Sequence, residues 1–205
     1  MRLVAQLREG AHHSGNWGGL IANAATVLSH ALATLSDRRG RLMVEGLRPA
    51  PLSDEVRAAL ADIEVSGGPG APEIDPDWGE PGLSPAERVF GWNTLEILAL
   101  GAGNIERPAA AIPGRAEASV MLRFVVGLDW RDVEGILQRH LDAHGFGMVK
   151  ATVDDGGNAT RTSGANPWVR LVLESLARST GKKPALLPNF GGTLPNDVFV
   201  EALGL

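Results

Sequence analysis

Residues 115–125 constrain the fold more than any other segment, because apolar and polar side chains alternate along nearly their whole length. One set of alternate positions is entirely apolar: Ala116, Ala118, Val120, Leu122 and Phe124. The other set is mostly polar: Arg115, Glu117, Ser119 and Arg123. Successive side chains of a strand point to opposite faces, so this segment is predicted to be a β-strand with one buried face.

Five further segments show strand or helix periodicity. Alternation predicts strands over 2–8, 92–100 and 148–153, and helical spacing of apolar residues predicts helices over 19–36 and 129–144. The order is strand, helix, strand, strand, helix, strand, which is the split βαβ, or ferredoxin-like, arrangement. We therefore expect an α+β fold in which an antiparallel sheet carries two helices on one face.

Residues 48–90 interrupt this pattern after the first helix. They are rich in proline and contain the cluster Gly67-Gly68-Pro69-Gly70. We expect an irregular surface insertion built around a short helix near 53–62. Residues 41–47, just before it, are a candidate short strand.

A different pattern begins after residue 155. Asn166 and Pro167 are typical of a helix start, and Gly181 is typical of a helix end. The side chains expected to form the buried stripe of this helix are Trp168, Leu171, Val172 and Leu176. We predict one domain over 1–155 and an incomplete second α/β segment over 156–205.

Composition excludes several classes of partner. The net charge of −5 comes from mixed charges without a basic stripe, so no nucleic-acid partner is expected. The absence of cysteine excludes disulfides and thiolate metal sites and fits a cytoplasmic protein. No leader peptide is evident at the N-terminus, and no apolar stretch approaches the ~18 residues of a membrane span.

Histidines provide the first candidate functional groups. His13 lies where the first strand gives way to a glycine-containing turn, within His12-His13-Ser14-Gly15-Asn16-Trp17-Gly18-Gly19. Spacing alone favours a structural or solvated turn histidine over a functional one, and His12 is expected to point elsewhere. His140 and His144 share a helix face, but without a third ligand a solvent-bordering face is the better interpretation than a metal site.

Arg123 and a glycine pair provide the second set. Arg123 lies on the polar face of the strongest strand, where it could bind a carboxylate bidentately or form a salt bridge to Glu117 or Glu96. Gly191-Gly192-Thr193 could present backbone N–H groups to an anion. The pattern alone leaves these alternatives open.

Taken in order, these motifs resemble the M20 family of zinc peptidases and amidohydrolases. The segment Leu7–Gly19 resembles the His-Ser-Gly…Gly-Gly start of the family's lid, or dimerisation, domain. Ala111-Ile112-Pro113 followed by Leu122-Arg123-Phe124-Val125 is similar to its Val-Ile-Pro…Arg strand pair. Gly191-Gly192-Thr193-Leu194-Pro195 resembles its Gly-Gly-Ser-x-Pro loop, where the chain re-enters the catalytic domain.

The resemblance implies a role for each matching residue. His13 would polarise the scissile carbonyl in the active site of a partner subunit. Arg123 would bind the terminal carboxylate of the substrate, and Gly192 and Thr193 would hold its backbone. Ala110 stands where the family often has Asn or Thr, so one substrate hydrogen bond is not expected here.

The resemblance also implies what this sequence lacks. The family's zinc ligands and general base lie outside the matched motifs, so no metal is expected to bind this chain and two zinc ions are expected in the full-length parent. We therefore expect an inactive piece of an M20-type enzyme that forms a homodimer through the lid and joins the missing catalytic domain. The parent would cleave a small peptide or an N-acyl amino acid. The alternative is a stand-alone ferredoxin-like ligand-binding or assembly module without catalysis.

Overall fold

The computed structural model describes residues 1–66 and 68–204. Gly67 of the glycine cluster and Leu205, at the end of the predicted 156–205 segment, lie outside the described residues. The chain forms two compact units, each described by itself. The first comprises 1–48, 94–122 and 129–156, and the second comprises 49–93, 123–128 and 157–204 of the described chain. The boundary at residue 155 stays a prediction.

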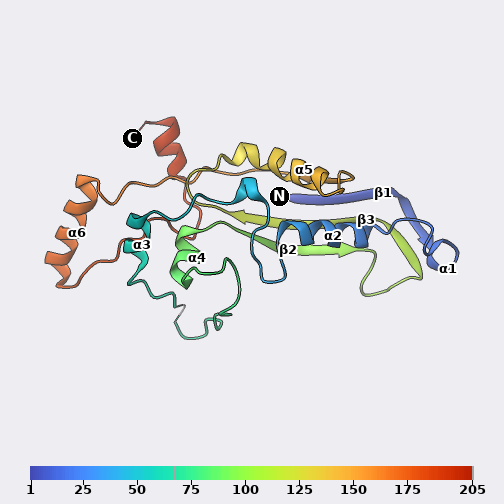
Figure 1. Cartoon of the computed structure of the whole chain (residues 1–205), viewed down its shortest axis with the longest axis horizontal. Coiled ribbons are helices and arrows are strands. Elements are labelled where there is room, and N and C mark those ends of the chain that lie inside the picture. Colours follow the sequence, from blue (N-terminus) through green and yellow to red (C-terminus); the bar gives the residue numbers. More distant parts are fainter. Residues whose placement is uncertain (67, 205) are drawn as a thin grey trace. The chain divides into compact units, whose positions relative to one another are not determined.

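The first unit is built on a four-stranded antiparallel sheet (Figure 1). Its strands are β1 (Arg2–His13), β2 (Thr94–Ala102), β3 (Ala111–Arg123) and β4 (Val149–Thr152), in the order β2-β3-β1-β4. The central strand β1 pairs antiparallel with both β3 and β4. This is the ferredoxin-like strand order, so the predicted α+β fold is confirmed.

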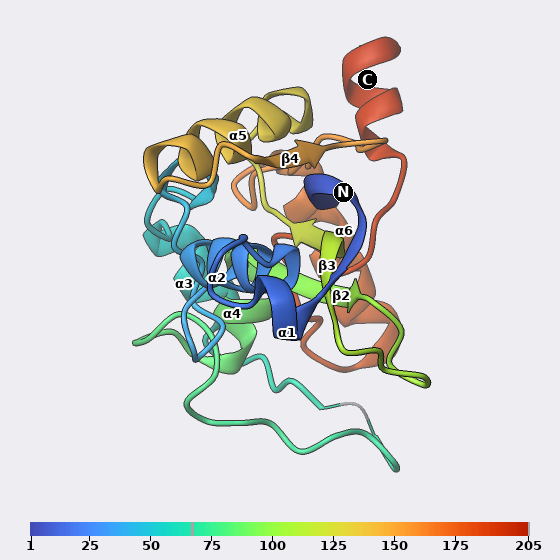
Figure 2. The ribbon, with the colours of Figure 1, turned by 90° about the vertical axis from the view of Figure 1, so that its right-hand side faces the viewer.

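Two helices cover one face of this sheet, α2 (Ala24–Leu35) and α5 (Val133–Ala143). Figure 2 shows both helices on the same side of the strands. Alternate residues of β3 are buried beneath them, as the sequence pattern predicts. The most completely buried side chains of the unit include Leu3, Leu28, Leu35, Val120, Leu137, Leu141 and Val149. Burial of this apolar set is the main term that stabilises the unit.

Several element boundaries differ from those predicted. β1 continues beyond residue 8 to His13, across a register shift between Gln6 and Ala11. Gly10 lies within this shift and has φ 66°, a conformation that favours glycine. The first long helix begins at Ala24, because the Asn23 side chain accepts hydrogen bonds from Ala25 N and Thr26 N and caps it there.

Residues 41–47 do not form the predicted strand. Leu42 makes only an isolated bridge with Ser36, and residues Glu45–Leu47 form a 3₁₀ turn. The helix predicted over 129–144 is confirmed, with a short 3₁₀ turn (Trp130–Asp132) before α5. Asp129 caps that turn by accepting from Arg131 N.

The second unit is mainly helical and irregular. It contains α3 (Asp54–Leu60), α4 (Pro85–Gly91), α6 (Pro167–Thr180) and a π-helical turn (Val198–Ala202). Its small core joins the first two helices, because Val56 and Leu60 of α3 pack with Ala86 of α4. The sequence analysis missed α4, although its Ser84 and Glu87 form a complete capping box.

Helix α6 is confirmed in extent but corrected in burial. Asn166 caps it, Pro167 occupies its first turn, and Gly181 ends it in the left-handed conformation with φ 66°. The stripe predicted to be buried is instead exposed: Trp168, Leu171, Val172 and Leu176 are 73%, 49%, 53% and 45% exposed. The reason is that no segment in the described part of the chain covers these side chains.

Candidate functional site

His13 ends β1 and caps the short helix α1 (Ser14–Trp17) that follows it. Its side chain is exposed, and its Nδ1 accepts a hydrogen bond from Gly15 N at 3.1 Å. The imidazole therefore folds back over the first turn of α1 instead of packing into the core. The exposed ring agrees with the solvated turn histidine that the spacing favours, and its catalytic role stays a prediction.

Two glycines of the same segment have close neighbours where a Cβ would lie. A Cβ on Gly15 would lie 2.8 Å from Cε1 of His13, and a Cβ on Gly18 would lie 2.6 Å from the carbonyl oxygen of Ser14. Real Cβ atoms do not approach other atoms so closely. Close packing therefore accounts for Gly15 and Gly18, whereas Gly19 has φ 78°, a conformation that favours glycine.

Ser14 attaches this turn to the loop before β3. Its backbone N and its Oγ both donate to the carbonyl oxygen of Ala110, at 2.8 Å and 3.1 Å. The neighbouring ring of His12 meets Trp17 edge-on, with the centroids 6.3 Å apart. His12 thus packs along the turn and does not join His13, as predicted.

Arg123 and Thr193 lie together in the second unit. The Nη1 of Arg123 donates to Oγ1 of Thr193 at 2.8 Å, although 70 positions separate the two residues. Both side chains are exposed. The alternative salt bridge to Glu117 is wrong, because Glu117 is bound by Arg115 and Arg2.

The loop around Gly192 completes this cluster. A Cβ on Gly192 would lie 2.9 Å from Cε1 of Phe190, so the Phe190 ring covers the glycine. The side chain of Asn189 donates to the carbonyl oxygen of Phe90 at 2.6 Å and anchors the loop to α4. The loop therefore presents Gly192 and Thr193 beside a guanidinium group.

Asn93, which directly precedes β2, is a positioning residue that the sequence analysis did not identify. It is 2% exposed, and its Oδ1 accepts from Val125 N at 2.8 Å. This bond fixes the backbone just after Arg123. A buried polar residue at the start of an apolar strand was the signal that could have identified it.

The two predicted groups occupy opposite ends of one strand. His13 pairs with Ala111, the first residue of β3, whereas Arg123 is the last residue of the same strand. A strand of 13 residues is about 40 Å long. Amide hydrolysis needs catalytic groups within hydrogen-bond reach of one carbonyl. Hence the structure brings Arg123, Gly192 and Thr193 together and does not bring His13 to them along β3.

The histidine pair on α5 has a structural environment. The rings of His140 and His144 stack with centroids 4.0 Å apart, and Nε2 of His140 lies 3.0 Å from the carbonyl oxygen of Thr34. Partial burial disfavours the charged form of His140 and is the main cause that lowers its pKa. The electrostatic effect of the nearby His144 lowers this pKa further. His140 is thus half-buried against α2 and His144 is exposed, as suits a helix face that borders solvent. Among the described residues, no three His, Cys, Asp or Glu side chains gather as metal ligands.

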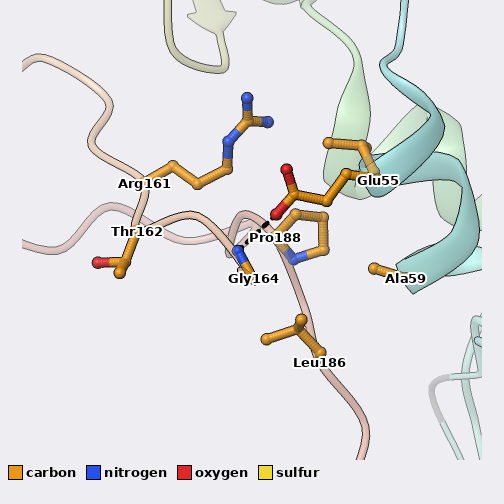
Figure 3. A pocket seen from close by; sticks show the side chains of 8 residues that line it. Glu55, Ala59, Arg161, Thr162, Gly164, Leu186 and Pro188 are labelled. Carbon is orange, nitrogen blue, oxygen red and sulfur yellow. Dashed lines mark hydrogen bonds between the residues drawn. The ribbon is translucent and has the colours of Figure 1, made fainter. Parts of the chain in front are cut away.

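A small hollow in the second unit lies beside α3 (Figure 3). Glu55 lines it and accepts hydrogen bonds from Ser163 Oγ at 3.0 Å and from Gly164 N at 2.5 Å. Arg161 stands at its rim, and Leu186 and Pro188 form part of its wall. None of the predicted site residues lines this hollow.

No helix in the part of the chain that the structure describes has the length and apolarity of a membrane span.

Comparison with known proteins identifies relatives of the chain. The yeast Cys-Gly metallodipeptidase DUG1 of Saccharomyces cerevisiae is 27% identical over 140 residues, which cover 64% of this chain and 28% of the yeast protein. The M20 family metallo-carboxypeptidase Sso-CP2 of Sulfolobus solfataricus has a similar structure, with a TM-score of 0.75 and 24% identity. The structure of Dug1p, described as a di-peptidase, gives a TM-score of 0.73 and 20% identity.

These likenesses extend along nearly the whole chain but along only part of each relative. The two structural matches cover 99% of this chain, and they cover 47% of Sso-CP2 and 44% of Dug1p. The chain therefore spans less than half the length of the proteins it resembles. At such identities the structural likeness shows the fold.

The peptidase dimerisation domain of the M20 family matches residues 6–148. This match covers more than half of the chain and includes β2, β3 and most of β1, whereas β4 and the first residues of β1 lie outside it. The chain belongs to the M20 peptidase family.

Proposed function

We propose that this chain supplies the lid, the dimer contacts and part of the substrate site of an M20-type metallopeptidase that hydrolyses amide bonds in small peptides or N-acyl amino acids. The proposed lid covers 1–155 with its 48–90 insertion, and 156–205 begins the returning part of a catalytic domain. The bond of 2.8 Å between Arg123 and Thr193 carries the proposal. The family resemblance implies that both of these residues bind the same substrate.

The cluster suits a substrate with a terminal carboxylate. A guanidinium group has a planar set of N–H donors that matches a carboxylate bidentately. Gly192 can offer only backbone groups to a substrate, because it has no side chain, and Thr193 adds a hydroxyl that can donate or accept. These residues orient the substrate and do not themselves break the bond.

His13 supplies the group that polarises the carbonyl, and it does so in a second copy of the chain. The length of β3 supports this, since His13 and Arg123 lie at its opposite ends. A dimer suits the sheet edge as well. The edge strand β2 exposes Ile97, Leu98 and Leu100 by 45%, 60% and 49%, and an exposed apolar edge favours pairing with another strand.

The metal ions of the proposed parent bind elsewhere. The described residues offer no group of three His, Cys, Asp or Glu side chains that could hold a metal, so the donor set of this chain does not fit a zinc centre. Zinc ions bound in the parent would supply the activation of the attacking water. Accordingly, we propose that the chain alone is inactive. Calorimetric titration with zinc should show no tight binding at 1:1 or higher stoichiometry.

A substrate comparison tests the role of Arg123. The chain would be joined to an M20 catalytic domain, and hydrolysis would be compared for a dipeptide with a free carboxylate and its C-terminal amide. Arg123→Ala should lower kcat/KM for the free acid by roughly 10- to 100-fold, as expected for a lost hydrogen bond to a charged group. For the amide, the change should be small.

The matched control is Arg115→Ala, which removes an exposed arginine from the same strand. This variant should leave both substrates unaffected. Equal losses for the acid and the amide in Arg123→Ala would contradict the carboxylate role. Substrate hydrolysis that needs no added catalytic domain, or tight stoichiometric zinc binding by the chain itself, would contradict the proposed incomplete site.

A further inference from the structure

The hydrogen bond that His13 accepts determines where its proton lies. A backbone amide can only donate, so Nδ1 of His13, 3.1 Å from Gly15 N, must carry a lone pair. A neutral imidazole has one protonated and one unprotonated nitrogen. The proton of the neutral ring is therefore on Nε2, which makes that nitrogen a hydrogen-bond donor.

The identity of Gly15 is what allows this contact. A Cβ at this position would lie 2.8 Å from Cε1 and 3.1 Å from Nδ1 of the same ring. The ring would have to turn away, and the bond to Gly15 N would be lost. Gly15 is not among the glycines with positive φ, so an alanine there is compatible with the backbone. The glycine is needed for the ring and not for the fold of the turn.

Ser14 keeps the donating amide in place. Its N and Oγ both bind the carbonyl oxygen of Ala110, which fixes the start of α1 against the loop before β3. The direction of the Gly15 N–H bond is set by this short helix. A helix of four residues has little stability of its own, so these attachments matter more than helix propensity.

We propose that Gly15 is a positioning residue that holds His13 in the Nε2–H tautomer and presents this N–H outward as a hydrogen-bond donor. The catalytic use of this N–H donor rests on the proposed function. A donor stabilises the negative charge that develops on a carbonyl oxygen during amide hydrolysis, whereas the Nδ1–H tautomer would present a lone pair to that oxygen. The backbone amide of Gly15 thus selects the form of the ring that the proposed chemistry needs.

Nuclear magnetic resonance of the 205-residue chain tests this directly. Long-range ¹H–¹⁵N correlations distinguish the two tautomers, and they would be recorded above about pH 8.5, where histidines are ordinarily neutral. The His13 signals among the five histidines are identified by their loss in His13→Gln. We expect the wild-type ring to be entirely the Nε2–H tautomer. Gly15→Ala should release it to the mixture of both tautomers seen for a free histidine.

The control is Asn16→Ala, an exposed substitution in the same helix that removes no contact to the ring. It should leave the His13 tautomer unchanged. An Nδ1–H or mixed tautomer in the wild-type chain would overturn the inference, as would a tautomer that Gly15→Ala leaves unaltered. The wild-type spectrum decides the first point even if the variant folds poorly.

The spectra also separate this inference from the proposed function. A pure Nε2–H tautomer that is lost in Gly15→Ala supports the positioning role whatever the chain does in catalysis. In a longer polypeptide with an M20 catalytic domain, Gly15→Ala should then lower kcat with little change in KM. If kcat is unchanged while the tautomer shifts, the catalytic role proposed for His13 fails and the tautomer assignment stands.

Discussion

Mixing two impaired variants should restore activity if His13 works in a partner subunit. His13→Ala removes the group at one end of β3, and Arg123→Ala removes the group at the other end, about 40 Å away along a 13-residue strand. In a dimer, each active site would combine Arg123 of one copy with His13 of the other. A mixed dimer of the two variants therefore has one site that carries both substitutions and one site that carries neither.

The size of the recovery follows from the symmetry. With random exchange of subunits, half of the dimers are mixed and each has one intact site of two, so the mixture should reach about a quarter of wild-type activity. A mixed dimer isolated by two different affinity tags should reach about half. Each variant alone should stay well below the mixture, because each of its sites lacks one group.

The assay is dipeptide hydrolysis by polypeptides that join this chain to an M20 catalytic domain, co-expressed so that subunits exchange. The matched control pairs Arg123→Ala with Thr193→Ala. These two residues of one copy contribute to the same site, since their side chains are joined by a hydrogen bond of 2.8 Å. Each site of a mixed dimer therefore carries one substitution, and no recovery is expected. Activity of the first mixture that does not exceed the sum of the two variants would refute the reasoning that His13 acts in trans.

Three further predictions concern the sheet edge, α5 and the core. Leu98→Lys should convert a dimer to monomers by light scattering without loss of fold, because Leu98 is 60% exposed on the edge strand. The folded state lowers the pKa of His140 below 6.5, so the unfolded chain binds more protons on acidification. The free energy of unfolding should therefore fall as the pH drops below about 6.5, and denaturation of His140→Gln should show a flatter pH dependence. Leu137→Ala, at a side chain with no exposed surface, should cost about 2–5 kcal/mol in chemical denaturation, whereas the exposed Val172→Ala should stay within about 0.5 kcal/mol.

The sheet could be predicted from the sequence because one of its faces is buried and the other is not. Each strand then carries an alternating pattern, as β3 does from Ala116 to Leu122. The limits of the elements were harder to predict. β1 crosses a register shift before His13, and the alternation that identifies a strand is lost at such a shift. The helix α4 was hidden in a proline-rich segment, although its capping box was visible in the sequence.

The site residues could be named from motifs, but their contacts could not. Arg123 and Thr193 are 70 positions apart, and no local pattern predicts that their side chains meet. The bond from Gly15 N to Nδ1 of His13 is local, yet it depends on the ring orientation and on the absence of a Cβ. A motif records which residue types occur together. It does not record which atom of a histidine is the donor.

The exposed apolar side chains fit the proposed incomplete site better than a stand-alone module. β2 exposes apolar residues along an edge whose backbone groups can pair with a second copy. The stripe of α6 is different, since Trp168, Leu171 and Leu176 follow helical spacing and a helix face has no backbone groups to pair. A stripe of this kind is buried by side chains of another packed element. The proposed incomplete site, with an identical copy at the sheet edge and a further domain over α6, would account for both surfaces, whereas a stand-alone assembly module would account only for the first.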